Sequence, residues 1–236
     1  GGNHLIHALR RNVNLKILLF NNRIYGLTKG QYSPTSEQGK ITKSTPQGSV
    51  DYSFNPVSLA LGAEATFVAR SIDSDRKHLS SVLAAAAAHE GTALVEIYQN
   101  CNIFNDGAWE QLKDAETADD LLIKLVHGEP IRFGKDGSKG VVRTADGQVA
   151  IANVAEVGED ALLVHDAHRE DPALAFALSR LSEVHTLADT PIGIFRDVKR
   201  PSYDRLVREQ LDEAREKKGA GDLQALVRGN DTWLVG

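Results

Sequence analysis

The sequence predicts an α/β protein with a doubly wound, mostly parallel sheet and a smaller α+β appendage at its C-terminal end. Three short apolar runs, Leu15–Phe20, Thr66–Arg70 and Thr92–Tyr98, have the length and composition of strands buried on both faces. Helical patterns separate these runs, and this alternation is typical of parallel sheets. We therefore expect a main domain over 1–114 and the appendage over 115–236.

The elements of the main domain follow in chain order. Asn3–Arg11 carries an apolar stripe with helical spacing and precedes the first strand. A long polar stretch, rich in Gly, Pro, Ser, Thr and Gln, then runs to about Pro56, and loops of that length are usually functional or disordered. Proline at a first helical position predicts a helix over 56–62, and Asp75–His89 is an amphipathic helix that Gly91 ends.

The appendage differs from the main domain in having shorter expected elements and more residues that favour turns. Glycine-rich turns at 134–137 and 145–147 indicate short strands around them. The remaining elements that we expect are helices over Ala115–Val126, Glu170–Leu187 and Tyr203–Lys218, and a strand over Pro191–Phe195.

Composition limits the classes of function. The 236 residues are 42% apolar and 25% charged, which is ordinary for a globular protein. The net charge of −5 gives no basic field for nucleic acid, and no apolar run reaches membrane-spanning length. The single cysteine excludes an internal disulfide, and we expect a cytoplasmic protein. Because the chain contains no methionine and opens on Gly1-Gly2, we also expect that its true N-terminus lies upstream.

The polar loop after the first strand is the first candidate site, because ligands of open α/β sheets bind at the carboxyl ends of strands. The amide oxygens of Asn21–Asn22 suit Mg²⁺, and Gly26 and Gly30 permit close approach to a phosphate. Thr28 adds a hydroxyl and Lys29 a cation. The other interpretation is that the asparagine pair only turns the chain, and spacing alone favours neither.

The same residues resemble a known family. Leu15–Asn22 is similar to the closing half of the motif of thiamine-diphosphate enzymes, which opens on Gly-Asp-Gly and ends on Asn-Asn. Ile24–Gln31, followed by Ser33-Pro34-Thr35, resembles the β subunits of 2-oxoacid:ferredoxin oxidoreductases. Gly1–Ala8 resembles the segment just after Gly-Asp-Gly in those subunits. The resemblance implies a fold of the thiamine-diphosphate-binding type, with the opening half of the motif upstream of Gly1.

Carried over residue by residue, the resemblance implies roles for the loop. Asn22 matches a side-chain magnesium ligand, and Ile24 matches the position whose backbone carbonyl completes the set. The positions that the resemblance places around thiamine diphosphate are Asn22, Ile24, Tyr25, Gly26, Leu27 and Thr28. Leu27 and Lys29 match positions that face the 2-oxoacid. A lysine suits a substrate with a second carboxylate, which points to 2-oxoglutarate over pyruvate, whereas the alternative is a solvated loop lysine.

Cys101 is the second candidate. A lone cysteine is more often a small buried apolar residue than a ligand, and one cysteine cannot hold an iron–sulfur cluster. The family resemblance, however, places the fourth ligand of a 4Fe–4S cluster after the corresponding strand and before a similar Phe-Asn-Asp segment. It therefore implies that Cys101 is that ligand, with the other three cysteines upstream.

The activity that the resemblance implies is oxidative decarboxylation of 2-oxoglutarate to succinyl-CoA, with coenzyme A as acyl acceptor and ferredoxin as electron acceptor. A separate α subunit is expected to complete the active site, so this chain alone is not expected to perform the reaction. The alternatives are a pyruvate or broad-range enzyme of the same family, another thiamine-diphosphate enzyme such as a decarboxylase, and a non-catalytic subunit with a degenerate site.

Overall fold

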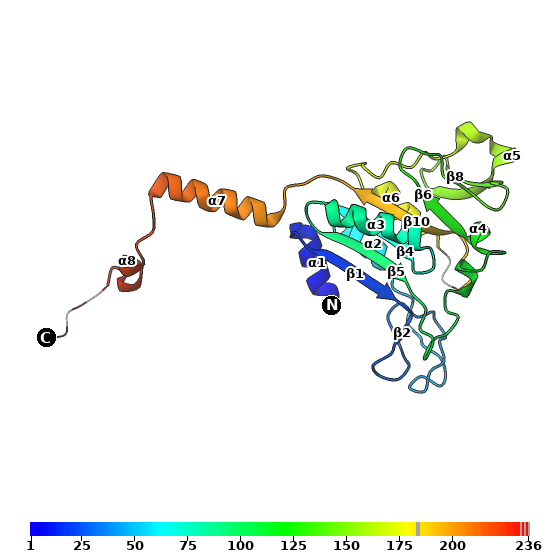
Figure 1. Ribbon diagram of the computed structural model, residues 1–236, viewed down its shortest axis with the longest axis horizontal. Helices are drawn as coiled ribbons and strands as arrows, with labels where there is room; N and C mark the ends of the chain where they lie inside the picture. Colours follow the sequence, from blue (N-terminus) through cyan, green and yellow to red (C-terminus); the bar gives the residue numbers. More distant parts are fainter. Residues whose placement is uncertain (183–184, 232, 234, 236) are drawn as a thin grey trace.

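The computed structural model describes residues 1–236 except 183–184, 232, 234 and 236. A five-stranded sheet with helices on both faces forms its centre (Figure 1). The strands, in their order across the sheet, are β1 (Lys16–Asn21), β5 (Ala93–Tyr98), β4 (Phe67–Ile72), β10 (Thr190–Asp197) and β6 (Leu122–Leu125). Three of the four pairings are parallel and the β4–β10 pairing is antiparallel, so the mostly parallel α/β class is confirmed.

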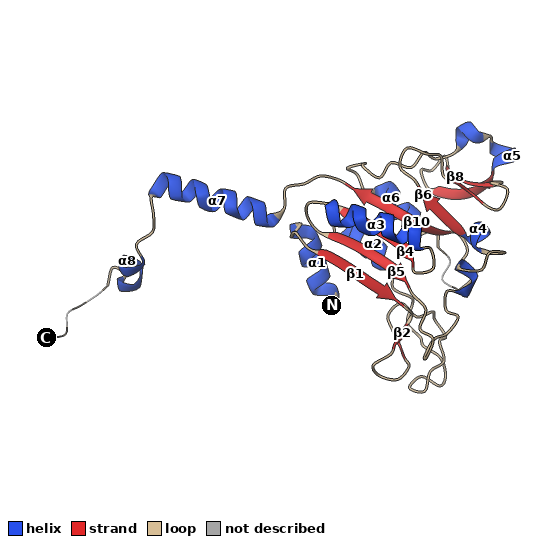
Figure 2. Ribbon diagram, viewed as in Figure 1, coloured by secondary structure: helices blue, strands red, loops and turns tan. Residues whose placement is uncertain are grey.

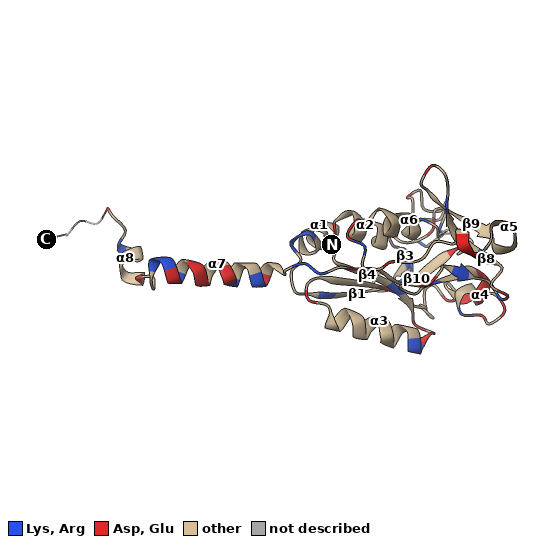
Figure 3. Cartoon of the chain, turned by 90° about the horizontal axis from the view of Figure 1, so that it is seen from above, with Lys and Arg blue, Asp and Glu red and all other residues tan. Residues whose placement is uncertain are grey.

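The two faces of the sheet are covered by different helices (Figure 3). One face carries α1 (Gly2–Arg11), α2 (Pro56–Gly62) and α6 (Ala173–Ser179), whose apolar residues share one core cluster with those of β4, β5 and β10. The other face carries α3 (Arg76–Ala88), which packs on β4 and β5. Alternate residues of each inner strand therefore enter opposite cores, as the continuous apolar runs predict.

Smaller elements surround this centre (Figure 2). A two-stranded hairpin and a three-stranded antiparallel sheet lie outside the main sheet. The remaining elements are β2 (Ile24–Tyr25), β3 (Gln31–Tyr32), η1 (Glu110–Leu112), α4 (Ala118–Leu121), β7 (Arg132–Phe133), β8 (Lys139–Arg143), β9 (Val149–Asn153), α5 (Val154–Val157), η2 (Glu159–Ala161), α7 (Tyr203–Lys218) and α8 (Leu223–Arg228).

The first strand differs from its prediction, because β1 is not buried on both faces. It is an edge strand of the described sheet, and Leu18 and Phe20 on one face are 44% and 54% exposed. Ile17 and Leu19 on the other face pack against the core beneath α1. Since α3 lies over β4 and β5, it leaves the Leu18 and Phe20 face of β1 uncovered. An apolar run predicts a strand, but its place in the sheet depends on which neighbours it meets.

Two helices predicted in the C-terminal half are wrong in extent. The segment Ala115–Val126 contains only the four-residue helix α4, and its apolar end forms strand β6 because it pairs in parallel with β10. The helix predicted over Glu170–Leu187 is confined to α6, and residues 183–184 lie outside the described part. Helix α7 has the predicted bounds, and it extends away from the body with no buried residue. The division at 114/115 stays a prediction, although β6 and β10 continue the main sheet beyond it.

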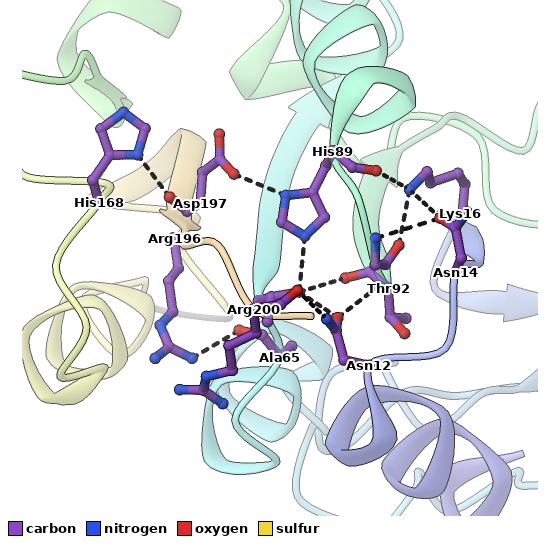
Figure 4. A network of polar contacts seen from close by, with 12 residues as sticks. Asn12, Asn14, Lys16, Ala65, His89, Thr92, His168, Arg196, Asp197 and Arg200 are labelled. Carbon is purple, nitrogen blue, oxygen red and sulfur yellow. Dashed lines mark hydrogen bonds and ion pairs between the residues drawn. The ribbon is translucent and has the colours of Figure 1, made fainter. Parts of the chain in front are cut away.

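A network of hydrogen bonds joins the elements at the edge of the sheet where β1, β5 and β4 begin (Figure 4). The Asn12 Oδ1 atom accepts from Thr66 Oγ1 at 2.7 Å, and Thr66 Oγ1 lies 2.8 Å from His89 Nε2. His89 Nδ1 lies 2.9 Å from an Asp197 carboxylate oxygen, and Asn12 Nδ2 donates to the Arg200 carbonyl at 3.0 Å. Burial lowers the pKa of His89 despite the nearby carboxylate. The network joins the ends of α1, α3 and β10 at the edge opposite the candidate site.

Candidate active site

The candidate site lies at the edge where β1, β5 and β4 end. In the register of these parallel strands, Asn21 is beside Tyr98 and Tyr98 is beside Ile72, so the loops after all three strands leave from one edge. An open, mostly apolar cavity of about 1010 Å³ runs beside β1 at this edge and beneath α1. The predicted site residues that line it are Asn22, Ile24, Tyr25, Gly26 and Leu27. The described residues Thr28, Lys29 and Cys101 lie outside its lining.

The two asparagines after β1 have different surroundings. Asn21 is buried; its amide donates to Glu96 Oε1 at 2.7 Å and its Oδ1 accepts from Thr35 Oγ1 at 2.7 Å. Asn22 is partly exposed, and its Oδ1 accepts the Ile24 N–H at a long 3.3 Å. Each Oδ1 also meets the N–H two residues ahead, so the pair does turn the chain. Asn21 is thus held by buried hydrogen bonds, while Asn22 is less buried; both residues line the cavity.

A buried ion pair holds Glu96, the hydrogen-bond partner of Asn21, in place. Arg70 Nε donates to Glu96 Oε2 at 2.7 Å, and the two side chains are 2% and 1% exposed. The guanidinium also donates to the Pro191 carbonyl at 3.3 Å and lies 5.1 Å from the centre of the Tyr98 ring. Burial raises the pKa of Tyr98 above its ordinary value. Glu96 therefore accepts from Arg70 on one oxygen and from Asn21 on the other, at the start of the loop that follows β1.

Replacing Glu96 with alanine is expected to lower the free energy of unfolding by about 3–5 kcal/mol, because it leaves Arg70 buried without its carboxylate. Urea unfolding followed by circular dichroism measures the change. Glu213→Ala is the control, since its pair with Lys217 is exposed and should contribute below about 1 kcal/mol. Equal losses in the two variants would show that the buried pair does not hold this edge.

The string that resembles the oxidoreductase β subunits forms the hairpin β2–β3. Lys29 N donates to the Gly26 carbonyl at 3.0 Å and Gly30 N to the Tyr25 carbonyl at 3.1 Å. Lys29 and Gly30 have φ of 62° and 101°, so the turn uses left-handed backbone conformations. Leu27 is 99% exposed at its tip, and Lys29 is also exposed. The hairpin therefore places Leu27 at the cavity, whereas Lys29 is exposed and lies outside the cavity lining.

Cys101 lies three residues beyond β5 and carries a free, partly buried thiol. Its carbonyl accepts the Asn105 N–H at 3.0 Å, which closes a tight turn over 101–105. Since β5 is the neighbour of β1, this turn begins at the same edge as the Asn22 loop. Within the described residues, no group of three or more His, Cys, Asp or Glu side chains could hold a metal, so Cys101 by itself does not form a cluster site.

Sequence reasoning did not identify the residues that support the loop after β1, which are the partly buried Thr35 and the buried Arg70, Glu96, Asn105 and Trp109. One signal was present, because Glu96 is a charged residue inside an apolar strand. A carboxylate at such a position needs a buried partner. The identity of the partner depended on strand order, which no local pattern contains.

Residues 1–97 match the model for the thiamine pyrophosphate enzyme, C-terminal TPP binding domain. The matched stretch, a domain of the thiamine-diphosphate-binding type, contains the Asn-Asn loop and all the residues that line the cavity. The chain is also 60% identical, over its full length, to the 2-oxoglutarate oxidoreductase subunit KorB of Mycobacterium tuberculosis. Its similarity is therefore to KorB and to the β subunits of 2-oxoacid:ferredoxin oxidoreductases.

Other relatives are similar to this chain over shorter stretches. A 2-oxoacid:ferredoxin oxidoreductase subunit beta of Saccharolobus solfataricus is 43% identical over 106 residues, which cover 45% of this chain and 35% of that protein. A chain of the 2-oxoglutarate:ferredoxin oxidoreductase from Magnetococcus marinus, solved with 2-oxoglutarate, coenzyme A and succinyl-CoA bound, matches 98% of this chain and 63% of its own length, with a TM-score of 0.66 and 26% identity. The present chain spans 63% of the Mycobacterium tuberculosis protein.

Within the described residues, no helix is both long and apolar enough to cross a membrane.

Proposed function

We propose that this chain forms part of the thiamine-diphosphate subunit of a 2-oxoglutarate:ferredoxin oxidoreductase. The observation that carries the proposal is the placement of Asn22, Ile24 and Gly26 along one cavity, at the sheet edge where the Cys101 turn also begins. The relatives named for 2-oxoglutarate support the substrate, and the matching thiamine pyrophosphate domain supports the cofactor.

The residues of the loop suit the proposed ligands. Mg²⁺ prefers oxygen donors, and the Asn22 carboxamide and the Ile24 carbonyl would supply two of them beside the cavity. Gly26 lets the backbone approach a diphosphate, and Tyr25, Leu27 and Thr28 extend the same loop toward the cofactor. Cys101 would contribute one thiolate to a 4Fe–4S cluster whose other ligands lie outside this chain.

The reaction would break the bond between the carboxylate and keto carbons of 2-oxoglutarate. Carbon dioxide leaves, the acyl group forms a thioester with coenzyme A, and two electrons pass singly to two ferredoxins as one proton is released. Bound thiamine diphosphate supplies the electron sink for this bond cleavage. The residues of this chain would hold the metal and diphosphate, shape the cavity and place the substrate against the open side of the hairpin.

A separate α subunit would cover the exposed side of the site. Apolar side chains that line the cavity are exposed, with Leu27 at 99%, Phe20 at 54% and Tyr25 at 47%. Such side chains gathered around a cavity are typical of surfaces that another protein covers. The assembled enzyme, rather than this chain alone, is therefore the proposed catalyst.

Lys29→Ala in the assembled enzyme is expected to reduce kcat/KM for 2-oxoglutarate by about tenfold or more, because the ammonium would pair with the second carboxylate of the substrate. Turnover of pyruvate, which lacks that carboxylate, should change little. Lys43→Ala is a matched control on a neighbouring exposed loop. Equal losses on both substrates would contradict the assigned role and favour a broad-range enzyme.

Anaerobic assays of the purified complex test the proposed function. Ferredoxin reduction should require 2-oxoglutarate, coenzyme A, thiamine diphosphate and Mg²⁺ together, with succinyl-CoA as product. Carbon dioxide release without coenzyme A or ferredoxin dependence would instead support a simple thiamine-diphosphate decarboxylase. Absence of any thiamine-dependent reaction would support a non-catalytic subunit.

A further inference from the structure

The turn that carries Cys101 and the loop that carries Asn22 are in direct contact. They leave adjacent parallel strands at paired positions, since Asn21 of β1 lies beside Tyr98 of β5. Two carbonyl oxygens of the Asn22 loop accept hydrogen bonds from side chains that follow β5. The contact therefore joins the two places at which separate cofactors are proposed.

Asn105 makes the central contact. Its amide nitrogen donates to the Asn22 carbonyl at 3.0 Å, and its amide oxygen accepts from Lys40 Nζ at 2.6 Å. Its own backbone N–H donates to the Cys101 carbonyl at 3.0 Å. The side chain is 8% exposed, so solvent cannot readily replace these partners. One buried residue thus fixes both the peptide of Asn22 and the turn of Cys101.

Two aromatic residues of the same segment strengthen the contact. Trp109 Nε1 donates to the Asn21 carbonyl at 2.9 Å, and its ring stacks on Tyr98 with centroids 3.8 Å apart. The Phe104 ring lies against the hairpin, since a Cβ atom added to Gly30 would meet it at 3.4 Å. The loop after β1 that carries Asn22 cannot move far without displacing the segment that follows Cys101.

We infer that Asn105 is a positioning residue that couples the metal–diphosphate site at Asn22 to the cluster site at Cys101. The inference rests on the proposed function, because it takes those two residues as ligands. A ligand that orders the Cys101 turn also orders the Asn22 peptide through Asn105. Binding linkage is reciprocal, so a loaded cluster should tighten binding of Mg²⁺ and thiamine diphosphate, and the reverse.

Asn105→Asp tests the coupling with little change in volume. The aspartate can still accept from Lys40 but cannot donate to the Asn22 carbonyl. Asn105→Ala removes both side-chain bonds. Asn102→Ala is the matched control, because Asn102 is an exposed residue of the same turn. Each variant is purified anaerobically as the full complex, and a thermal unfolding scan confirms folding.

Binding of thiamine diphosphate and Mg²⁺ is measured by quenching of tryptophan fluorescence, with the cluster loaded and after its removal. The wild-type complex and Asn102→Ala should bind more tightly when the cluster is loaded. In both Asn105 variants the affinity should fall about tenfold, the cluster dependence should disappear and the electron paramagnetic resonance spectrum of the reduced cluster should change.

Each negative result of these binding experiments would have a different meaning. If the wild-type complex holds both cofactors and shows no dependence of one on the other, the coupling is wrong and the proposed function stands. If folded Asn105→Asp binds as the wild type does, or if Asn102→Ala loses as much affinity, Asn105 is not the positioning residue. A wild-type complex that holds neither cofactor would overturn the proposed function, and the inference with it.

Discussion

Asn22→Ala in the assembled enzyme is expected to lower kcat/KM for 2-oxoglutarate by about 100-fold or more, while the melting temperature stays nearly unchanged. The carboxamide lines the cavity and makes a long 3.3 Å bond to the Ile24 N–H, so its loss should affect folding little. Its proposed task is to hold Mg²⁺, and a metal that has lost one of its oxygen ligands binds more weakly.

The measurement is a titration of activity against Mg²⁺ at saturating thiamine diphosphate, beside a thermal unfolding scan. Excess Mg²⁺ should restore part of the activity of Asn22→Ala. Asn102→Ala, in an exposed turn at the same edge, should titrate like the wild type. An Asn22→Ala enzyme with an unchanged Mg²⁺ requirement and full activity would leave the asparagine pair with a turn-forming role alone.

Cys101→Ser is expected to remove most of the bound iron and to reduce electron transfer to ferredoxin by about 100-fold or more. A serine oxygen is a poor substitute for a thiolate ligand of an iron–sulfur cluster. Cys101 is partly buried in a tight turn, and serine is close to cysteine in size, so the turn should persist. Iron content after anaerobic purification and the spectrum of the reduced cluster measure the effect.

The control for Cys101→Ser is again the exposed Asn102→Ala substitution in the same turn, which should keep its iron. Unchanged iron content in Cys101→Ser would show that the cluster lies elsewhere in the complex. Cys101 would then be the small apolar residue that a lone cysteine more often is.

The local patterns predicted most of the main domain correctly. The strands β4 and β5 are mostly apolar because both of their faces are covered, and α3 is capped by Asp75, whose side chain accepts the His78 N–H. The errors lie where tertiary contacts overrule a local pattern. The end of Ala115–Val126 becomes a strand because β10 offers a pairing edge that no helix could use.

In the candidate site, too, local patterns predicted some residues and missed those that depend on tertiary contacts. That Asn22, Ile24 and Gly26 lie together could be predicted, because they are close in the sequence and follow a recognisable strand. Glu96 and Asn105 could not, because they meet Asn21 and Asn22 only after β5 has paired with β1. Sequence proximity predicts which residues line the cavity together, whereas strand order determines which side chains hold them in place.

The most direct test of the central claim is a single-turnover experiment on the assembled enzyme. The complex, loaded with thiamine diphosphate, Mg²⁺ and its cluster, is mixed anaerobically with 2-oxoglutarate and coenzyme A in a stopped-flow instrument. The proposed function predicts rapid bleaching of the cluster absorbance, which fails in Asn22→Ala and is absent in Cys101→Ser because no cluster is held. A fully loaded wild-type complex whose cluster stays oxidised after 2-oxoglutarate is added would contradict it.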